Sequence, residues 1–220
     1  MEILQEFFTY VSMNAGYIWI EFYRHFLMAA YGVLFAAIIA IPLGILIAKY
    51  GKLSGWVLSL GSIIQTIPAL GAMAIIMMVF GLGVNTAVFT LALYSILPIT
   101  QNTYVGMKGV DENVVEAAYA SGMTRFQVLR MVELPLAISV IMAGLRTAIV
   151  IGIGIAAIGA FVGAGGLGAI IITGTNATDG TAIILAGAIP TAFMAIIADL
   201  AMGWIERKLH PVKPSKPQAS

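Results

Sequence analysis

The chain has 220 residues, of which 60% are hydrophobic and only 10% are charged, and its formal net charge is +1. Soluble globular domains carry about 25% charged residues, so this composition excludes an ordinary water-soluble domain and indicates a protein that lies in lipid. The sequence contains no cysteine, which excludes disulfide bonds and thiolate metal sites, and its small net charge gives no indication of nucleic-acid binding.

The first 25 residues are rich in aromatic side chains and begin with acidic residues, unlike a secretory signal peptide. Aromatic residues collect at membrane–water interfaces, so we expect an interfacial helix over residues 1–25. The two histidines, His25 and His210, are far apart and lack a metal-ligand pattern. We therefore expect them to be interfacial and tail residues, and we predict no metal site.

Nearly uncharged stretches that are long enough to cross a bilayer as helices follow this segment. Five such spans are predicted: residues 26–48, two spans within 53–107 that are joined by a turn at 81–86, residues 136–162 and residues 181–204. The prediction is an all-α membrane protein with five transmembrane helices and a permease domain over residues 26–209. Residues 210–220 are rich in proline and lysine, which predicts a disordered cytoplasmic tail.

Lysine and arginine in short loops indicate orientation, because they are retained on the cytoplasmic side. With five spans, the loop after the first span, the polar segment 105–134 and the C-terminal tail all fall on one side. Their basic residues are Lys49, Lys52, Lys108, Arg125, Arg130, Arg207, Lys208, Lys213 and Lys216. The N-terminus is therefore predicted to be outside, and the C-terminus and the polar segment to be cytoplasmic.

Prolines and glycines interrupt the predicted spans. Each span has one proline, and the five are Pro42, Pro68, Pro98, Pro135 and Pro190. The glycine-rich run at 163–168 is expected to end the fourth span, which favours either close helix packing or a short re-entrant element beside a transport pathway. The candidate pathway or gate residues are Pro68, Tyr94, Phe161, Gly163, Gly165, Gly166 and Gly168. For the two aromatic residues, packing against lipid is the alternative.

Two charged residues lie inside predicted spans, Arg146 in the fourth and Asp199 in the fifth. Both fall in the cytoplasmic half of the bilayer, where an unpaired charge is costly. Three interpretations remain open: each side chain extends to the interface, the two form an intramembrane pair, or they take part in moving a substrate.

The polar segment between the third and fourth spans predicts two short helices over about 111–134. Asp111 is expected to cap a helix over 112–121 that ends at Gly122. Thr124 begins a capping box, which predicts a second helix over about 125–133 that stops at Leu134-Pro135. We expect a segment of this kind to be bound by a partner protein, and an amphipathic helix resting on the bilayer is the alternative.

This segment resembles the EAA loop of permeases from bacterial type I ABC importers. That loop reads EAA, three residues, Gly, nine residues, Ile, any residue and Leu-Pro, and the chain has Val132 in place of Ile. The resemblance implies the type I ABC importer permease fold and a coupling helix that docks into a cleft on a cytoplasmic ATPase. With two residues of the second helix added, the predicted ATPase-coupling residues are Glu116, Ala117, Ala118, Gly122, Arg125, Phe126, Leu134 and Pro135.

Two further stretches, QTIPALGAM at 65–73 and FVGAGGLG at 161–168, are similar to permeases of osmoprotectant importers. Those carry glycine betaine, carnitine or choline, and methionine-importer permeases of the same fold are the alternative. The resemblance implies a multi-pass protein of the bacterial inner membrane. Its implied partners are an ABC ATPase dimer, a second permease subunit (identical or homologous) and an extracytoplasmic substrate-binding protein.

The sequence lacks the G-x-x-x-x-G-K-[ST] phosphate-binding loop. ATP and Mg²⁺ are therefore expected on the partner ATPase, with no cofactor and no enzymatic activity on this chain. A passive channel is a rival prediction, but it leaves the motif at 116–135 without a role. An intramembrane enzyme is not favoured, because no span combines a nucleophile with a base.

Overall fold

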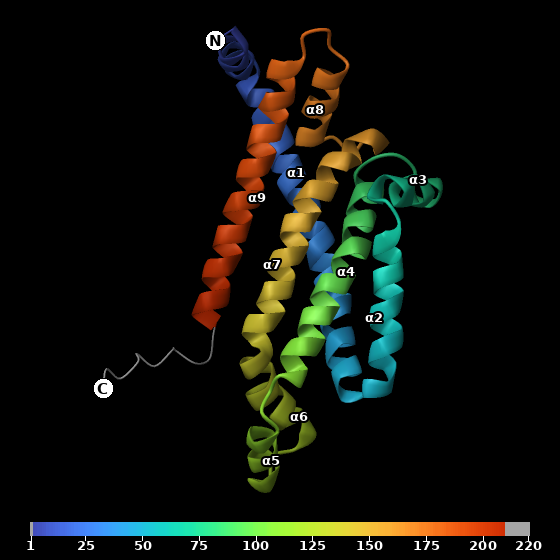
Figure 1. The fold of residues 1–220 in the computed structure, drawn as a ribbon, viewed down its shortest axis with the longest axis vertical. Coiled ribbons are helices and arrows are strands. Elements are labelled where there is room, and N and C mark those ends of the chain that lie inside the picture. Colours follow the sequence, from blue (N-terminus) through green and yellow to red (C-terminus); the bar gives the residue numbers. More distant parts are fainter. Residues whose placement is uncertain (1, 210–220) are drawn as a thin grey trace, which may run out of the picture.

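The computed structural model describes residues 2–209, and nearly all of them lie in helices (Figure 1). The elements are α1 (Glu2–Lys49), α2 (Gly51–Thr66), α3 (Ala69–Phe80), α4 (Val84–Lys108), α5 (Glu112–Ala120), α6 (Arg125–Val128), the π-helical η1 (Leu129–Glu133), α7 (Leu134–Ile158), the 3-10 helix η2 (Gly159–Val162), α8 (Leu167–Thr175) and α9 (Thr181–Leu209). An all-helical structure is what lipid demands, because each helix satisfies its own backbone hydrogen bonds. His210 and the predicted tail lie outside the described residues.

The five predicted spans are recovered in this part of the chain. Four helices are long and apolar enough to cross a membrane by themselves: α1, α4, the continuous helix Arg125–Val162 and α9. The pair α2 and α3 supplies a fifth span when it is counted as one broken helix, with a bend of 96° between its halves. The second span is therefore an elbow rather than a straight helix.

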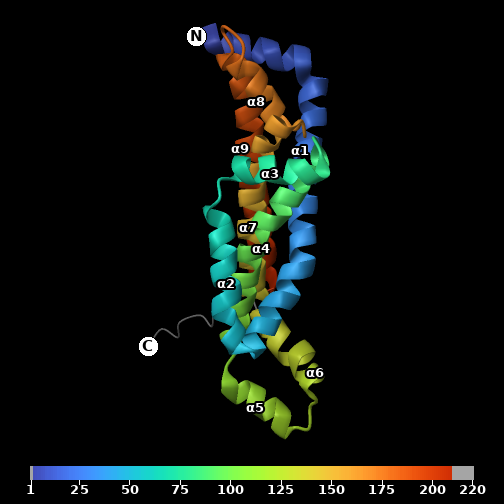
Figure 2. The same cartoon turned by 90° about the vertical axis from the view of Figure 1, so that its right-hand side faces the viewer.

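The long helices form a layer in the order α9, α7, α4 and α2, and α1 lies behind it (Figure 1). Figure 2 shows α1 and α2 on opposite sides of α4. Glycines permit the close approach of these helices, because a Cβ at Gly32 would lie 2.5 Å from that of Leu91, and one at Gly144 would lie 2.7 Å from that of Asn102. Small residues at contacts are the usual means of packing helices in lipid.

The first helix differs from the expected division at residue 25. α1 runs without a break through that position and is interrupted instead at Asn14, where φ is −117° and ψ is 17°. The Asn14 amide donates to the Tyr10 carbonyl oxygen over 2.9 Å, a local bond that competes with the helical pattern. The part before Asn14 lies across the end of the bundle (Figure 2), and residues 15–25 belong to the long helix.

The second helix of the polar segment does not stop at Leu134-Pro135, contrary to the prediction. It continues through η1 into α7 as one helix over residues 125–162. A proline ring inside an α-helix clashes with the carbonyl four residues earlier, which here is that of Met131. Met131 lies in the π-helical turn, whose wider winding accommodates the ring and lets the helix continue.

Candidate functional site

The predicted caps of the polar segment are confirmed. The Asp111 carboxylate accepts a hydrogen bond from the Asn113 N–H over 2.9 Å and starts α5. Thr124 and Gln127 form both bonds of a capping box at the start of α6. Gly122, between the two helices, has φ of +82°, a left-handed conformation that favours glycine. Short-range bonds therefore shape this segment, which protrudes beyond the ends of the long helices (Figures 1 and 2).

Most of the predicted coupling residues lie on the surface of α5 and α6. Phe126 is 67% exposed, and Tyr119 and Met131 of the same segment are also exposed. Glu116, Ala117, Gly122 and Arg125 are also exposed. Ala118, in contrast, is only 8% exposed. Ala118 therefore packs inside the segment rather than on its surface.

An ion pair links the coupling segment to the end of the first span. Lys49 Nζ lies 3.3 Å from Glu133 Oε2, although the two make no hydrogen bond. Lys49 ends α1 and Glu133 ends η1. The π-helical turn is thus held from the side by α1, at the point where α6 passes into α7.

Tyr94, a predicted pathway residue, anchors the elbow between α2 and α3. Its hydroxyl donates a short hydrogen bond to the Ile67 carbonyl oxygen, and its own carbonyl accepts a bond from the Gln65 side chain over 3.1 Å. Ile67 precedes Pro68 and is extended, as residues before proline prefer to be. Because Tyr94 is buried and its hydroxyl is engaged, its place is in the support of the elbow.

The glycine run forms a turn between η2 and α8. Gly163, Gly165 and Gly166 have φ of +74°, +76° and +77°. Gly168 lies in the first turn of α8, and a Cβ there would collide with the Ala157 carbonyl. Phe161 is exposed. Of the two interpretations of this run, the structure shows the close helix packing, because α8 lies against the end of α7 at Ala157.

The candidate pathway segments meet at this end of the bundle. The Gly83 N–H, in the turn between α3 and α4, donates to the Val162 carbonyl oxygen in η2 over 2.7 Å. The elbow and the glycine turn are thereby joined through α3, although they are far apart in sequence.

Two residues of α1, Glu21 and His25, are buried, and a role for Glu21 was not predicted from the sequence. Glu21 is 5% exposed and His25 is 0% exposed, so the expectation of an interfacial His25 is wrong. Glu21 Oε2 accepts from the Gly166 N–H over 2.5 Å, and Glu21 Oε1 accepts from Arg24 Nη1 over 2.9 Å. The signal that could have revealed them is their spacing of four, which places both on one face of the helix.

His25 contacts two other helices with its two ring nitrogens. Its Nδ1 accepts from the Leu167 N–H over 3.2 Å, so its Nε2 carries the hydrogen and donates to the Ile153 carbonyl oxygen over 2.9 Å. His25 therefore connects α1 to the start of α8 and to α7.

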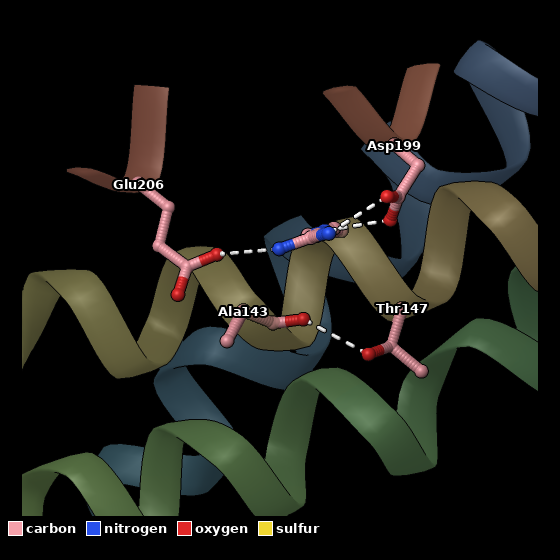
Figure 3. Close-up of polar contacts among 5 residues, drawn as sticks. Ala143, Thr147, Asp199 and Glu206 are labelled. Carbon is pink, nitrogen blue, oxygen red and sulfur yellow. Dashed lines mark hydrogen bonds and ion pairs between the residues drawn. The ribbon is translucent and has the colours of Figure 1, made fainter. Parts of the chain in front are cut away.

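Of the three interpretations of Arg146 and Asp199, the pair is the arrangement that the structure shows. Arg146 Nε and Nη2 donate to the two Asp199 carboxylate oxygens over 2.6 and 2.7 Å. Glu206, whose part was not predicted, accepts from Arg146 Nη1 over a longer 3.4 Å. Figure 3 shows Asp199 and Glu206 reaching the same guanidinium group, and the facing Gly203 leaves room for it. A forked pair of this kind joins α7 to α9.

Among residues 2–209, no group of three histidine or carboxylate side chains lies close enough to hold a metal ion. The described residues have an exposed capped helix pair at one end, a glycine turn at the other end, and a continuous helix between them.

Residues 40–211 match the protein family described as binding-protein-dependent transport system inner membrane component. The chain is 66% identical over 216 residues to the glycine betaine/carnitine/choline transport system permease protein OpuCD of Bacillus subtilis (strain 168), covering 98% of this chain and 94% of that protein. It is 38% identical over 208 residues to the glycine betaine/carnitine/choline transport system permease protein OpuCB of the same strain, covering 94% of this chain and 95% of that protein.

Its fold is similar to a solved inward-facing structure of the MetNI methionine ABC transporter, with a TM-score of 0.79 at 20% identity over 87% of this chain and 95% of that one.

Proposed function

Because the chain belongs to the family of binding-protein-dependent transport system inner membrane components, we propose that it is a permease subunit of an ATP-driven importer of quaternary-ammonium osmoprotectants. The main structural support for ATP-driven transport is the capped, exposed pair α5–α6, which continues directly into the membrane-spanning α7. The 66% identity to a glycine betaine/carnitine/choline permease supports the substrate class. The methionine transporter shares only the fold at 20% identity, so it gives no support to methionine as the substrate.

In this proposal α5 and α6 dock on a cytoplasmic ATPase dimer, which binds ATP and Mg²⁺. The arrangement of basic residues supports a cytoplasmic position for this end of the molecule. The end of α1, the start of α2, the end of α4 and the end of α9 all lie at the same end as α5 and α6 (Figure 1). Each of these helix ends carries lysine or arginine, which supports an N-terminus on the outside by the positive-inside rule.

A second permease subunit completes the pathway, and an extracytoplasmic binding protein delivers the substrate. Two different permease proteins of one named transport system resemble this chain, at 66% and 38% identity. This supports a pair of homologous rather than identical permeases in the membrane of a bacterial cell. Closure of the ATPase dimer moves both coupling segments, and α7 carries the motion into the membrane.

The docking role is tested by the substitution Phe126→Ala in the complete transporter, reconstituted in liposomes with its binding protein. Loss of a central apolar anchor commonly costs an interface about tenfold or more in affinity. We therefore expect at least a roughly tenfold lower ATP-driven uptake of labelled glycine betaine and reduced co-purification of the ATPase.

Phe8→Ala is the matched control, because Phe8 is also 67% exposed but lies at the opposite end of the molecule. It is expected to retain uptake. Normal uptake by Phe126→Ala would contradict the docking role, and uptake that needs no ATP would favour a passive channel.

A further inference from the structure

Glu21 and His25 supply what the start of α8 lacks. The first N–H groups of a helix have no acceptor within the helix, and the residue that precedes α8 is Gly166, which has no side chain to cap it. The Glu21 carboxylate and the His25 ring accept from the N–H groups of Gly166 and Leu167, across 145 and 142 residues of sequence. The cap of α8 therefore comes from α1.

The glycine turn packs directly against these side chains. A Cβ at Gly165 would lie 2.6 Å from Arg24 Nη1 and 3.0 Å from Glu21 Oε2. A Cβ at Gly166 would lie 3.1 Å from His25 Nδ1. The glycine turn is therefore in close contact with Glu21, Arg24 and His25.

The same histidine also contacts the helix that begins at the coupling segment. His25 Nε2 donates to the carbonyl of Ile153, in the last part of α7. The continuous helix from Arg125 to Val162 has 38 residues, so at about 1.5 Å per residue it extends roughly 57 Å. One continuous helix thus joins the coupling segment to the carbonyl that His25 contacts.

We propose that Glu21 and His25 are positioning residues that couple α7 to the outer glycine turn, so that a tilt of α7 moves the turn and α8 with it. The proposal rests on the proposed function, in which an ATPase moves the other end of α7. The glycine turn bonds to the α3–α4 turn through η2, so its displacement changes the outer end of the pathway. A role in folding alone would reduce assembly and ATP hydrolysis together, whereas a coupling role separates ATP hydrolysis from uptake.

The test compares His25→Leu with His25→Gln in the reconstituted complex. Leucine removes both hydrogen bonds, whereas the glutamine side chain has an acceptor oxygen and a donor NH2 group and can replace both. We expect His25→Leu and Glu21→Leu to assemble, to hydrolyse ATP within about twofold of the wild-type rate and to lose at least roughly tenfold in uptake. His25→Gln is expected to recover most of the uptake. Thr103→Val, which removes a buried hydroxyl that bonds only within α4, is the matched control and should keep both activities.

A second readout follows the outer end directly, because the chain has no native cysteine. In a Phe161→Cys variant, the rate of modification by a charged thiol reagent is expected to change when ATP is added. This ATP dependence should disappear when His25→Leu is added, and also when Gly166→Ala displaces the turn from the histidine. Gly166→Ala serves as the test if the leucine variants do not assemble.

Three results would overturn this inference. The first is an equal loss of ATP hydrolysis and uptake in His25→Leu, and the second is a failure of His25→Gln to recover uptake. The third is a thiol-modification rate in Phe161→Cys with Gly166→Ala that still changes when ATP is added. Absence of ATP-driven uptake by the unaltered complex would instead contradict the proposed function.

Discussion

Arg146 is a charged residue inside a membrane-spanning helix, and the structure shows how its charge is accommodated. Asp199 meets its guanidinium with two short bonds, Glu206 adds a longer one, and Gly203 leaves the space that the group occupies. All three partners lie on α9, so the charge of α7 is neutralised by one neighbouring helix. The group therefore fixes the packing of α9 on α7.

We expect Asp199→Asn to lower the midpoint of thermal unfolding of the purified chain in detergent by several degrees, because the guanidinium loses one of its two short bonds and keeps Glu206 as its charged partner, at the longer distance. Exchange of the two charges, Arg146→Asp with Asp199→Arg, should recover part of the loss. Thr147→Val is the control, since its hydroxyl bonds only to Ala143 in its own helix (Figure 3). An unchanged midpoint in Asp199→Asn would show that the pair does not hold the two helices.

Among the elements, the elbow of α2 and α3 depends on a contact from a third helix. Proline at position 68 makes the break possible, and the hydroxyl of Tyr94 on α4 fixes its direction by bonding to Ile67. Tyr94→Phe leaves the Ile67 carbonyl without that partner, so we expect a loss of roughly 1–3 kcal/mol in the free energy of unfolding. Denaturant titration in detergent measures it.

Tyr104→Phe is the matched control for this experiment, because the Tyr104 hydroxyl, on the same helix, makes no hydrogen bond within residues 2–209. A loss of equal size in both variants would argue against a specific role for the hydroxyl of Tyr94.

At the scale of the whole molecule, the coupling segment and the N-terminal part of α1 lie at opposite ends (Figure 2). Because the sequence has no cysteine, single cysteines report the side on which each end lies. In intact protoplasts, a membrane-impermeant thiol reagent is expected to modify Phe8→Cys and to leave Phe126→Cys unmodified until the cells are permeabilised. Modification of Phe126→Cys from outside would reverse the proposed orientation.

Features that depend on near neighbours in the chain were predicted from the sequence alone. The five spans follow from runs of apolar residues, and the caps at Asp111 and Thr124 and the turn at Gly122 follow from bonds over two to five residues. The family resemblance was equally readable, because the motif at 116–135 lies in one continuous segment.

The tertiary structure decided the features that join distant segments. It showed that Glu21 and His25 cap α8, that Glu206 joins the pair of Arg146 and that Ala118 is buried. Hydropathy cannot predict such contacts, because the helices in lipid are apolar on nearly every side and their sequences do not say which side faces a neighbour. Close packing and interhelical hydrogen bonds choose that side, and both exist only when the helices are assembled.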